Sequence, residues 1–187
     1  MTERRLADLE LAGNALCLDF ANTVNSRRQL AHDYLSTSDD VLAWARHAGA
    51  LRDRADGRRP ALSRAHALRD AIYRTFSAIA AGQPAPADDV ATVSAAYTRA
   101  LARAVLRPTA DGFELTWTPP VDPLWMVARS AGELLLDGPL DRVGECPGCG
   151  WLFLDTSRNG SRRWCNMLTC GTRDKMARYH RRGARLR

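Results

Sequence analysis

The stretch "CPGCGWLFLDTSRNGSRRWCNMLTCGTRDK", residues 146–175, carries four of the five cysteines in the chain. Their spacing is C-x2-C, then fifteen residues, then C-x4-C, and the four positions are Cys146, Cys149, Cys165 and Cys170. Paired cysteines at such spacing are typical of tetrahedral zinc sites, in which four thiolates fill the coordination sphere. The pattern therefore predicts one structural zinc ion per chain, with no open position for water or substrate.

Two alternatives for the cysteines are a redox C-x-x-C motif and a set of unconnected thiols. A redox motif usually begins a helix after a strand, whereas the Pro-Gly pair at 147–148 indicates a turn and residues 151–155 alternate like a strand. The Asn-Gly pair at 159–160 predicts a hairpin turn, so that a hairpin crosses between the two cysteine pairs. With the second pair opening a C-terminal helix, these parts predict a treble-clef-like zinc finger.

Two further side chains are excluded from the metal site. His180 lies ten residues past Cys170, about 15 Å along a helix, which is too far to join the same ion. Cys17 lies among apolar residues and fits a small core side chain better than a nucleophile.

Length and composition limit the classes of protein. The 187 residues allow one or two domains, and no apolar run is long enough to cross a membrane. The N-terminal residues mix acids and bases and lack a secretory signal pattern, so we expect a cytoplasmic protein. Clustered cysteines in that compartment indicate metal or redox chemistry rather than disulfides.

The net charge of +6 is concentrated at the C-terminal end. Residues 141–187 carry 11 basic against 4 acidic side chains, while residues 1–140 carry 16 against 17. A basic helix beside a zinc scaffold is typical of nucleic-acid-binding proteins. The alternative is a solvated charged surface, or one that pairs with acids of another domain or protein. The candidate nucleic-acid-binding residues are Arg158, Arg162, Arg163, Arg173, Lys175, Arg178, Arg181 and Arg182.

The first 140 residues read mostly as helices. Apolar residues recur at steps of three and four within 13–24, 36–51, 60–82, 90–105 and 121–138. Asn14 is the candidate N-cap of the first helix, and an Asp-Gly turn signal before alternating residues 113–117 predicts a short hairpin. We therefore expect a mainly α fold with a small β contribution (α+β), divided into a helical domain at 1–140 and the zinc finger at 141–187.

Asp19 and Asn22 form a small polar cluster at the end of the first predicted helix. They could line a ligand pocket, or they could form a buried cap network that closes this helix against its neighbours. Short polar side chains at a helix end usually bond backbone groups, so we favour the structural interpretation and expect no catalytic residue here.

The C-terminal stretch resembles the CGNR-type zinc finger, and "LCLDFANTV" at 16–24 resembles the partner domain ABATE, described as a stress-induced transcription regulator. The resemblance implies cytoplasmic bacterial proteins whose finger binds DNA and whose N-terminal domain senses an effector. One position departs from the pattern, because Thr172 stands where the family has Asn. Both residues can cap a helix, but Thr lacks the amide that could read a base, and the register of the helix start, with Asn166 as a rival cap, is open.

These observations favour a zinc-finger DNA-binding transcription regulator. The second hypothesis is a zinc-stabilised module that binds another protein, and the third is an enzyme that uses an N-terminal pocket. No nucleophile elbow, phosphate loop or dinucleotide fingerprint occurs in the sequence, so we expect no enzyme.

Overall fold

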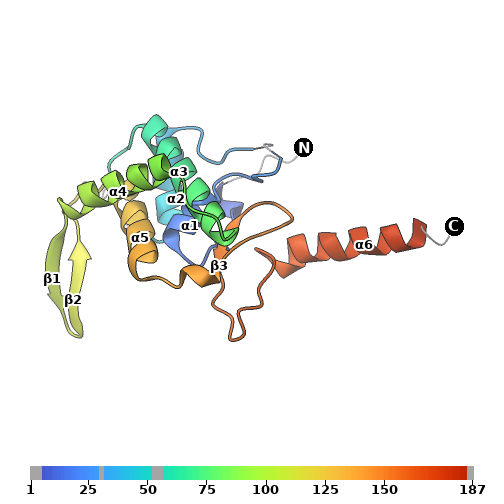
Figure 1. The fold of residues 1–187 in the computed structure, drawn as a ribbon. Helices are drawn as coiled ribbons and strands as arrows, with labels where there is room; N and C mark the ends of the chain where they lie inside the picture. The colour runs from blue at the N-terminus through green and yellow to red at the C-terminus, as the bar shows by residue number, and fades with distance from the viewer. Residues whose placement is uncertain (1–5, 30–31, 52–56, 185–187) are drawn as a thin grey trace.

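The computed structural model describes residues 6–29, 32–51 and 57–184. Five α-helices form the body, two short hairpins flank it, and a sixth α-helix projects from it (Figure 1). The helices are η1 (Leu6–Asp8), α1 (Leu16–Ala21), α2 (Ser38–His47), α3 (Leu62–Ala80), α4 (Ala87–Leu101), α5 (Pro123–Asp137), η2 (Leu140–Arg142), the π-helical turn η3 (Met167–Gly171) and α6 (Thr172–Ala184). The strands are β1 (Val105–Thr109), β2 (Gly112–Thr116), β3 (Val143–Glu145) and β4 (Leu152–Leu154). The expected α+β class is confirmed.

Side-chain caps mark the starts of α2 and α5. Thr37 accepts a hydrogen bond from the Asp40 amide and forms a complete capping box at the start of α2. Asp122 accepts from the Leu124 amide and caps α5. The expected Asn14 cap is wrong, because α1 begins after Ala15 without a side-chain cap. Asn14 instead adopts a positive φ of 57° and donates to the Leu154 carbonyl at 2.9 Å.

The core lies where α1, α3 and α5 meet. Phe20 and Phe76 are fully buried here, and the Phe20 ring lies 4.9 Å from the ring of Trp44 on α2. The apolar cluster continues from these helices into the C-terminal region, where Leu152 and Phe153 of β4 are also buried. The helical part and the finger therefore share one core, although the sequence predicts two domains.

Both sheets are antiparallel hairpins. The expected hairpin at 113–117 is confirmed, with Leu106 opposite Leu115, and it projects from the end of the body opposite α6 (Figure 1). The hairpin expected around 159–160 is wrong. β4 pairs with β3, the strand that precedes it, and the turn that joins these two strands carries Cys146 and Cys149. Asp155 explains the difference: its carboxylate accepts from the amides of Ser157 and Arg162 and folds the intervening segment into a loop. No helix within the described residues is long and apolar enough to cross a membrane.

Candidate metal centre and adjoining basic surface

The first cysteine pair lies on a tight knuckle between β3 and β4. The Cys146 amide donates to the Trp151 carbonyl at 2.8 Å, and the Gly150 amide donates to the Cys146 carbonyl at 2.8 Å. Gly150 has a φ of +77°, a left-handed conformation that favours glycine. The turn predicted from Pro147 and Gly148 is therefore present, and it directs Cys146 and Cys149 to one side.

The second pair precedes the C-terminal helix. Cys165 lies in a loop, and Cys170 lies in η3, which continues directly into α6. Asn166 is the N-cap of this segment, because its side chain accepts from the Leu168 amide at 2.7 Å. Thr172 caps no helix start; its hydroxyl donates back to the Met167 carbonyl at 3.2 Å. Asn166, the rival candidate, therefore sets the start of the helix.

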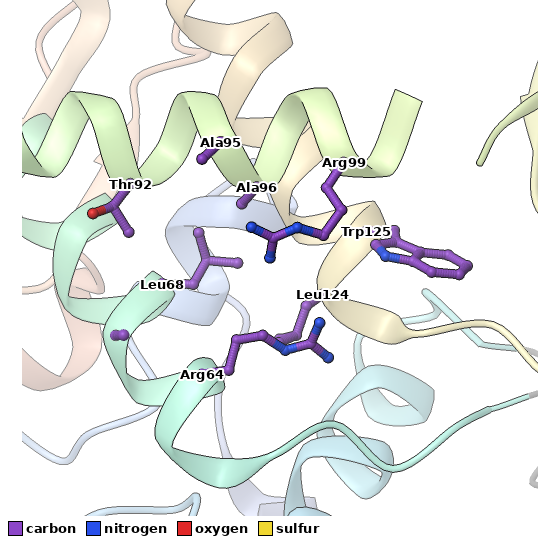
Figure 2. A pocket seen from close by; sticks show the side chains of 9 residues that line it. Arg64, Leu68, Thr92, Ala95, Ala96, Arg99, Leu124 and Trp125 are labelled. Carbon is purple, nitrogen blue, oxygen red and sulfur yellow. The ribbon is translucent and has the colours of Figure 1, made fainter. Parts of the chain in front are cut away.

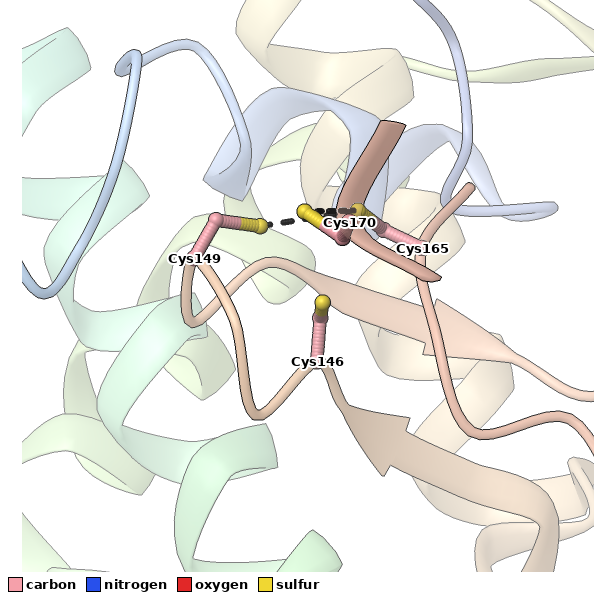
Figure 3. A group of neighbouring side chains, drawn as sticks. All are labelled: Cys146, Cys149, Cys165 and Cys170. Carbon is pink, nitrogen blue, oxygen red and sulfur yellow. Dashed lines mark hydrogen bonds between the residues drawn. The ribbon is translucent and has the colours of Figure 1, made fainter. Parts of the chain in front are cut away.

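The four sulfur atoms converge on one point (Figure 3). All lie within 4.8 Å of one another, and Cys165 Sγ is 3.5 Å from Cys149 Sγ and 3.6 Å from Cys170 Sγ. A tetrahedral zinc ion with Zn–S bonds of about 2.3 Å separates its sulfurs by about 3.8 Å. All four cysteines are buried, so the donor set and its spacing fit one closed, structural zinc ion.

The electrostatics of the thiols support a cation at this point. Contact with Cys146 and Cys149, together with burial, raises the pKa of the Cys165 thiol well above its ordinary value. Contact with Cys146 raises the pKa of Cys149 to about 12, whereas hydrogen bonds from both neighbours hold the pKa of Cys146 well below its usual range. Thiolates this close together repel one another, and a bound Zn²⁺ supplies the positive charge that neutralises them.

The segment after α1 holds the knuckle from the N-terminal side. The Arg27 amide donates to the Cys149 carbonyl at 2.8 Å, and the Ser26 hydroxyl donates to the same oxygen at 3.1 Å. The indole of Trp151 donates to the Val24 carbonyl at 2.7 Å. Sequence reasoning did not find these contacts, because they join groups more than 120 residues apart and carry no composition signal.

Asn22 connects the two predicted domains directly. Its side-chain amide donates to the Leu152 carbonyl at 2.8 Å, and its side-chain oxygen accepts from the Leu152 amide at 2.9 Å. Asn22 is 1 % exposed, so both bonds are protected from water. The side chain thus extends the pairing of β4 in the way a neighbouring strand would.

Asp19 is buried beside the same junction. Its carboxylate accepts from the Gly13 amide at 2.7 Å. Burial raises the pKa of Asp19 from 3.8 to about 6, against the lowering effects of the Gly13 hydrogen bond, Arg162 and His47. Both members of the predicted polar cluster therefore contact backbone groups of the fold.

The raised pKa of Asp19 gives a testable pH dependence. The folded state binds the proton more tightly than the unfolded state, so the contribution of Asp19 to stability is greatest below pH 3.8 and is lost as the pH rises through about 6. Asp19→Asn should remove this contribution, and the difference in unfolding free energy between the two proteins should change by up to about 3 kcal/mol between pH 4 and 7. Denaturant titrations of both proteins at each pH measure that difference. Any loss of zinc at low pH affects both proteins alike and cancels in the difference. A difference independent of pH would contradict the assignment.

Arg162 serves the junction as well. Its guanidinium donates to the carbonyls of Ala12 at 2.7 Å, Trp164 at 3.1 Å and Cys165 at 2.5 Å, and it stacks 4.5 Å over the Phe153 ring. These carbonyls occupy the donors with which it would bind a phosphate, so we leave Arg162 out of the DNA-binding surface proposed below.

The other candidate basic residues lie around the finger. Arg158, Arg163, Arg173 and Lys175 are exposed, and the Arg163 guanidinium lies 5.1 Å over the Trp164 ring. Arg178, Arg181 and Arg182 lie on the described backbone of α6, but their side chains fall outside the described part of the structure. The basic surface is the name we give to the helix α6 together with Arg158, Arg163, Arg173 and Lys175.

Apolar side chains accompany this surface. Met176 and Tyr179 of α6 are 52 % and 73 % exposed. Met167 and Leu168, at the turn before α6, are also exposed. The helix is thus anchored at its first turn and presents both charged and apolar groups beyond it.

Two family models match the chain. ABATE, described as "Putative stress-induced transcription regulator", matches residues 14–138, and the CGNR zinc finger matches residues 142–183. No curated protein matches the chain. The first match covers well over half of the sequence and includes Asn22, which bonds the backbone of β4. The second match contains all four zinc ligands. The chain therefore belongs to the ABATE family and carries a CGNR zinc finger with one structural zinc ion.

Proposed function

We propose that this zinc-finger regulatory protein acts by binding double-stranded DNA, with the basic surface on the phosphate backbone. The observation that supports it best is the geometry of α6, which projects from the body (Figure 1) and begins directly after the zinc ligand Cys170. An α-helix fits into the major groove. The zinc centre holds the N-terminal end of α6 in place.

The charge of the surface determines the mode of binding. Lysine and arginine side chains that contact phosphates release counterions, which makes affinity fall with salt. Arginine can also bind guanine through two parallel hydrogen bonds. With Thr172 donating back into its own turn, we assign no base contact to that position. In this proposal the protein is a cytoplasmic regulator and not an enzyme. Asp19 and Asn22, the polar cluster considered as a possible pocket, bond backbone groups.

Removing two charges from α6 tests this mode of binding. Replacing Arg181 and Arg182 with alanine should lower the slope of log affinity against log salt by up to about 2, because each phosphate contact contributes about −0.9. Fluorescence anisotropy of a labelled duplex across a salt series measures the slope. The matched control is Arg103→Ala with Arg107→Ala, which removes two positive charges at the far end of the molecule. Equal slopes in both double variants and in the wild type would place the DNA contact elsewhere.

A protein partner is the second candidate. The exposed Met167, Leu168 and Met176 beside the finger support it, because clustered apolar side chains on a surface often mark an interaction site. Met176→Glu distinguishes the two roles: it should weaken binding to a protein partner strongly, while its effect on a phosphate-dominated DNA contact should be limited to the added negative charge.

A further inference from the structure

A pocket of about 300 Å³ opens between α3, α4 and α5. Its apolar wall is formed by Leu68, Ala96, Leu124 and Trp125. Leu68 and Leu124 are buried, so this wall is part of the packed interior of the helical region. No residue of the finger lines the pocket among the described residues, which separates it from the zinc centre and the basic surface.

Two arginines face this space from opposite helices (Figure 2). Arg99 extends from α4 and has no hydrogen-bonding or ion-pair partner within the described parts of the chain. Arg64 extends from α3 and donates to Asp122, the fully buried cap of α5. A guanidinium has five N–H donors, so Arg64 keeps donors for a second acceptor.

The charge of the pocket is unbalanced. Its described lining contains two cations and no acidic side chain. The nearby carboxylate of Asp122 is already shared between Arg64, Arg58 at 3.5 Å and the amide of Leu124. Arg99 is exposed at the edge of the pocket, and the described lining offers it no acidic partner. An anion bound against the apolar wall would therefore form a charge-assisted hydrogen bond with Arg99.

We propose that this pocket binds a small organic anion that combines a carboxylate with an aromatic ring. Arg99 and the remaining donors of Arg64 would hold the carboxylate, since the guanidinium fork matches its two oxygens. The ring would lie against Leu68, Leu124 and Trp125, where stacking and burial favour it. At about 30 Å³ per water-sized group, the volume accommodates about ten non-hydrogen atoms, the size of a benzoate.

Calorimetric titration of the zinc-loaded full chain with benzoate tests the site. We expect one saturable site with a dissociation constant on the order of 0.1–1 mM, in the range for so small a ligand. Benzamide, which has the ring without the charge, and acetate, which has the charge without the ring, should each bind at least about tenfold more weakly. Equal binding of either probe, or no saturable binding of benzoate, overturns the proposal.

Variants localise the site. Arg99→Ala should weaken benzoate binding about tenfold or more, since it removes the charge-assisted hydrogen bonds. Ala95→Phe, at an exposed lining position, should obstruct the pocket without disturbing the core. Arg107→Ala, which removes the same charge from β1 outside the pocket, should leave the affinity unchanged. Wild-type affinity in a folded Arg99→Ala protein would overturn the assignment. The result is independent of DNA binding, because no probe contains nucleic acid.

Discussion

Cys149→Ser should abolish zinc binding and destabilise the protein well beyond the finger. Structural zinc contributes about 10–16 kcal/mol of apparent binding free energy in small fingers, more than the 5–15 kcal/mol of net stability of many domains. The knuckle also anchors the segment after α1 through the Cys149 carbonyl, and β4 belongs to the same core as α1 and α3. We therefore expect the loss of metal to lower the melting temperature of the whole chain.

Elemental analysis and amide hydrogen exchange measure the two parts of this prediction. The wild type should hold one zinc per chain and the variant none, and the variant should lose protection both at 143–154 and at 22–27. Cys17→Ala is the matched control, because Cys17 is equally buried but lies outside the metal site. Normal zinc content in Cys149→Ser would disprove the ligand assignment, and unchanged protection at 22–27 would show that the finger folds independently.

Asn22→Ala should destabilise the protein by about 2–6 kcal/mol. The substitution removes both partners of the Leu152 backbone and leaves a buried amide and a buried carbonyl unsatisfied, each costing about 1–3 kcal/mol. Denaturant unfolding measures the change. Asn22→Asp is the informative second variant: it keeps the acceptor for the Leu152 amide but places an oxygen against the Leu152 carbonyl, so it should not restore stability.

Asn14→Gly serves as the control for this prediction, because glycine accepts the positive φ of 57° at this position without strain. Asn14 also donates to a β4 carbonyl, that of Leu154, but it is exposed, so water can replace its bonds and the cost should stay near 0.5–1.5 kcal/mol. Should Asn22→Ala cost no more than Asn14→Gly, the Asn22–Leu152 pair would not be the main connection between the helical region and the finger.

Sequence reasoning succeeded where the determining interactions are local. The spacing of the cysteines reveals the zinc ligands because each pair lies within six residues of chain. The Asp-Gly signal before β2 likewise acts within one turn, and the structure contains the predicted hairpin. Helix periodicity placed α2, α3 and α5 because each buries an apolar stripe. It also indicated α4, but only Val93 and Ala100 of its apolar residues are buried, and the expected segment 90–105 runs into β1.

The junction between the two predicted domains could not be predicted in the same way. Asn22 bonds a residue 130 positions away, and Arg162 reaches Ala12 across 150; neither contact leaves a periodic or compositional trace. Asn-Gly at 159–160 indicated a hairpin, but the Asp155 carboxylate competes for the following amides and produces a loop. Charge alone also assigned Arg162 to the nucleic-acid-binding set, although three backbone carbonyls bind its guanidinium.

Binding of the wild-type, zinc-loaded protein to a mixed-sequence DNA duplex tests the proposed function most directly. The measurement is the dissociation constant at 50 and 200 mM salt, with zinc-stripped protein in parallel. If the basic surface contacts about four to six phosphates, affinity should fall about 100- to 2,000-fold between these salt concentrations, and the zinc-stripped protein should not bind at low salt. An intact, zinc-loaded protein that shows no salt-sensitive binding to the duplex would contradict the DNA-binding role and leave the protein partner as the better explanation.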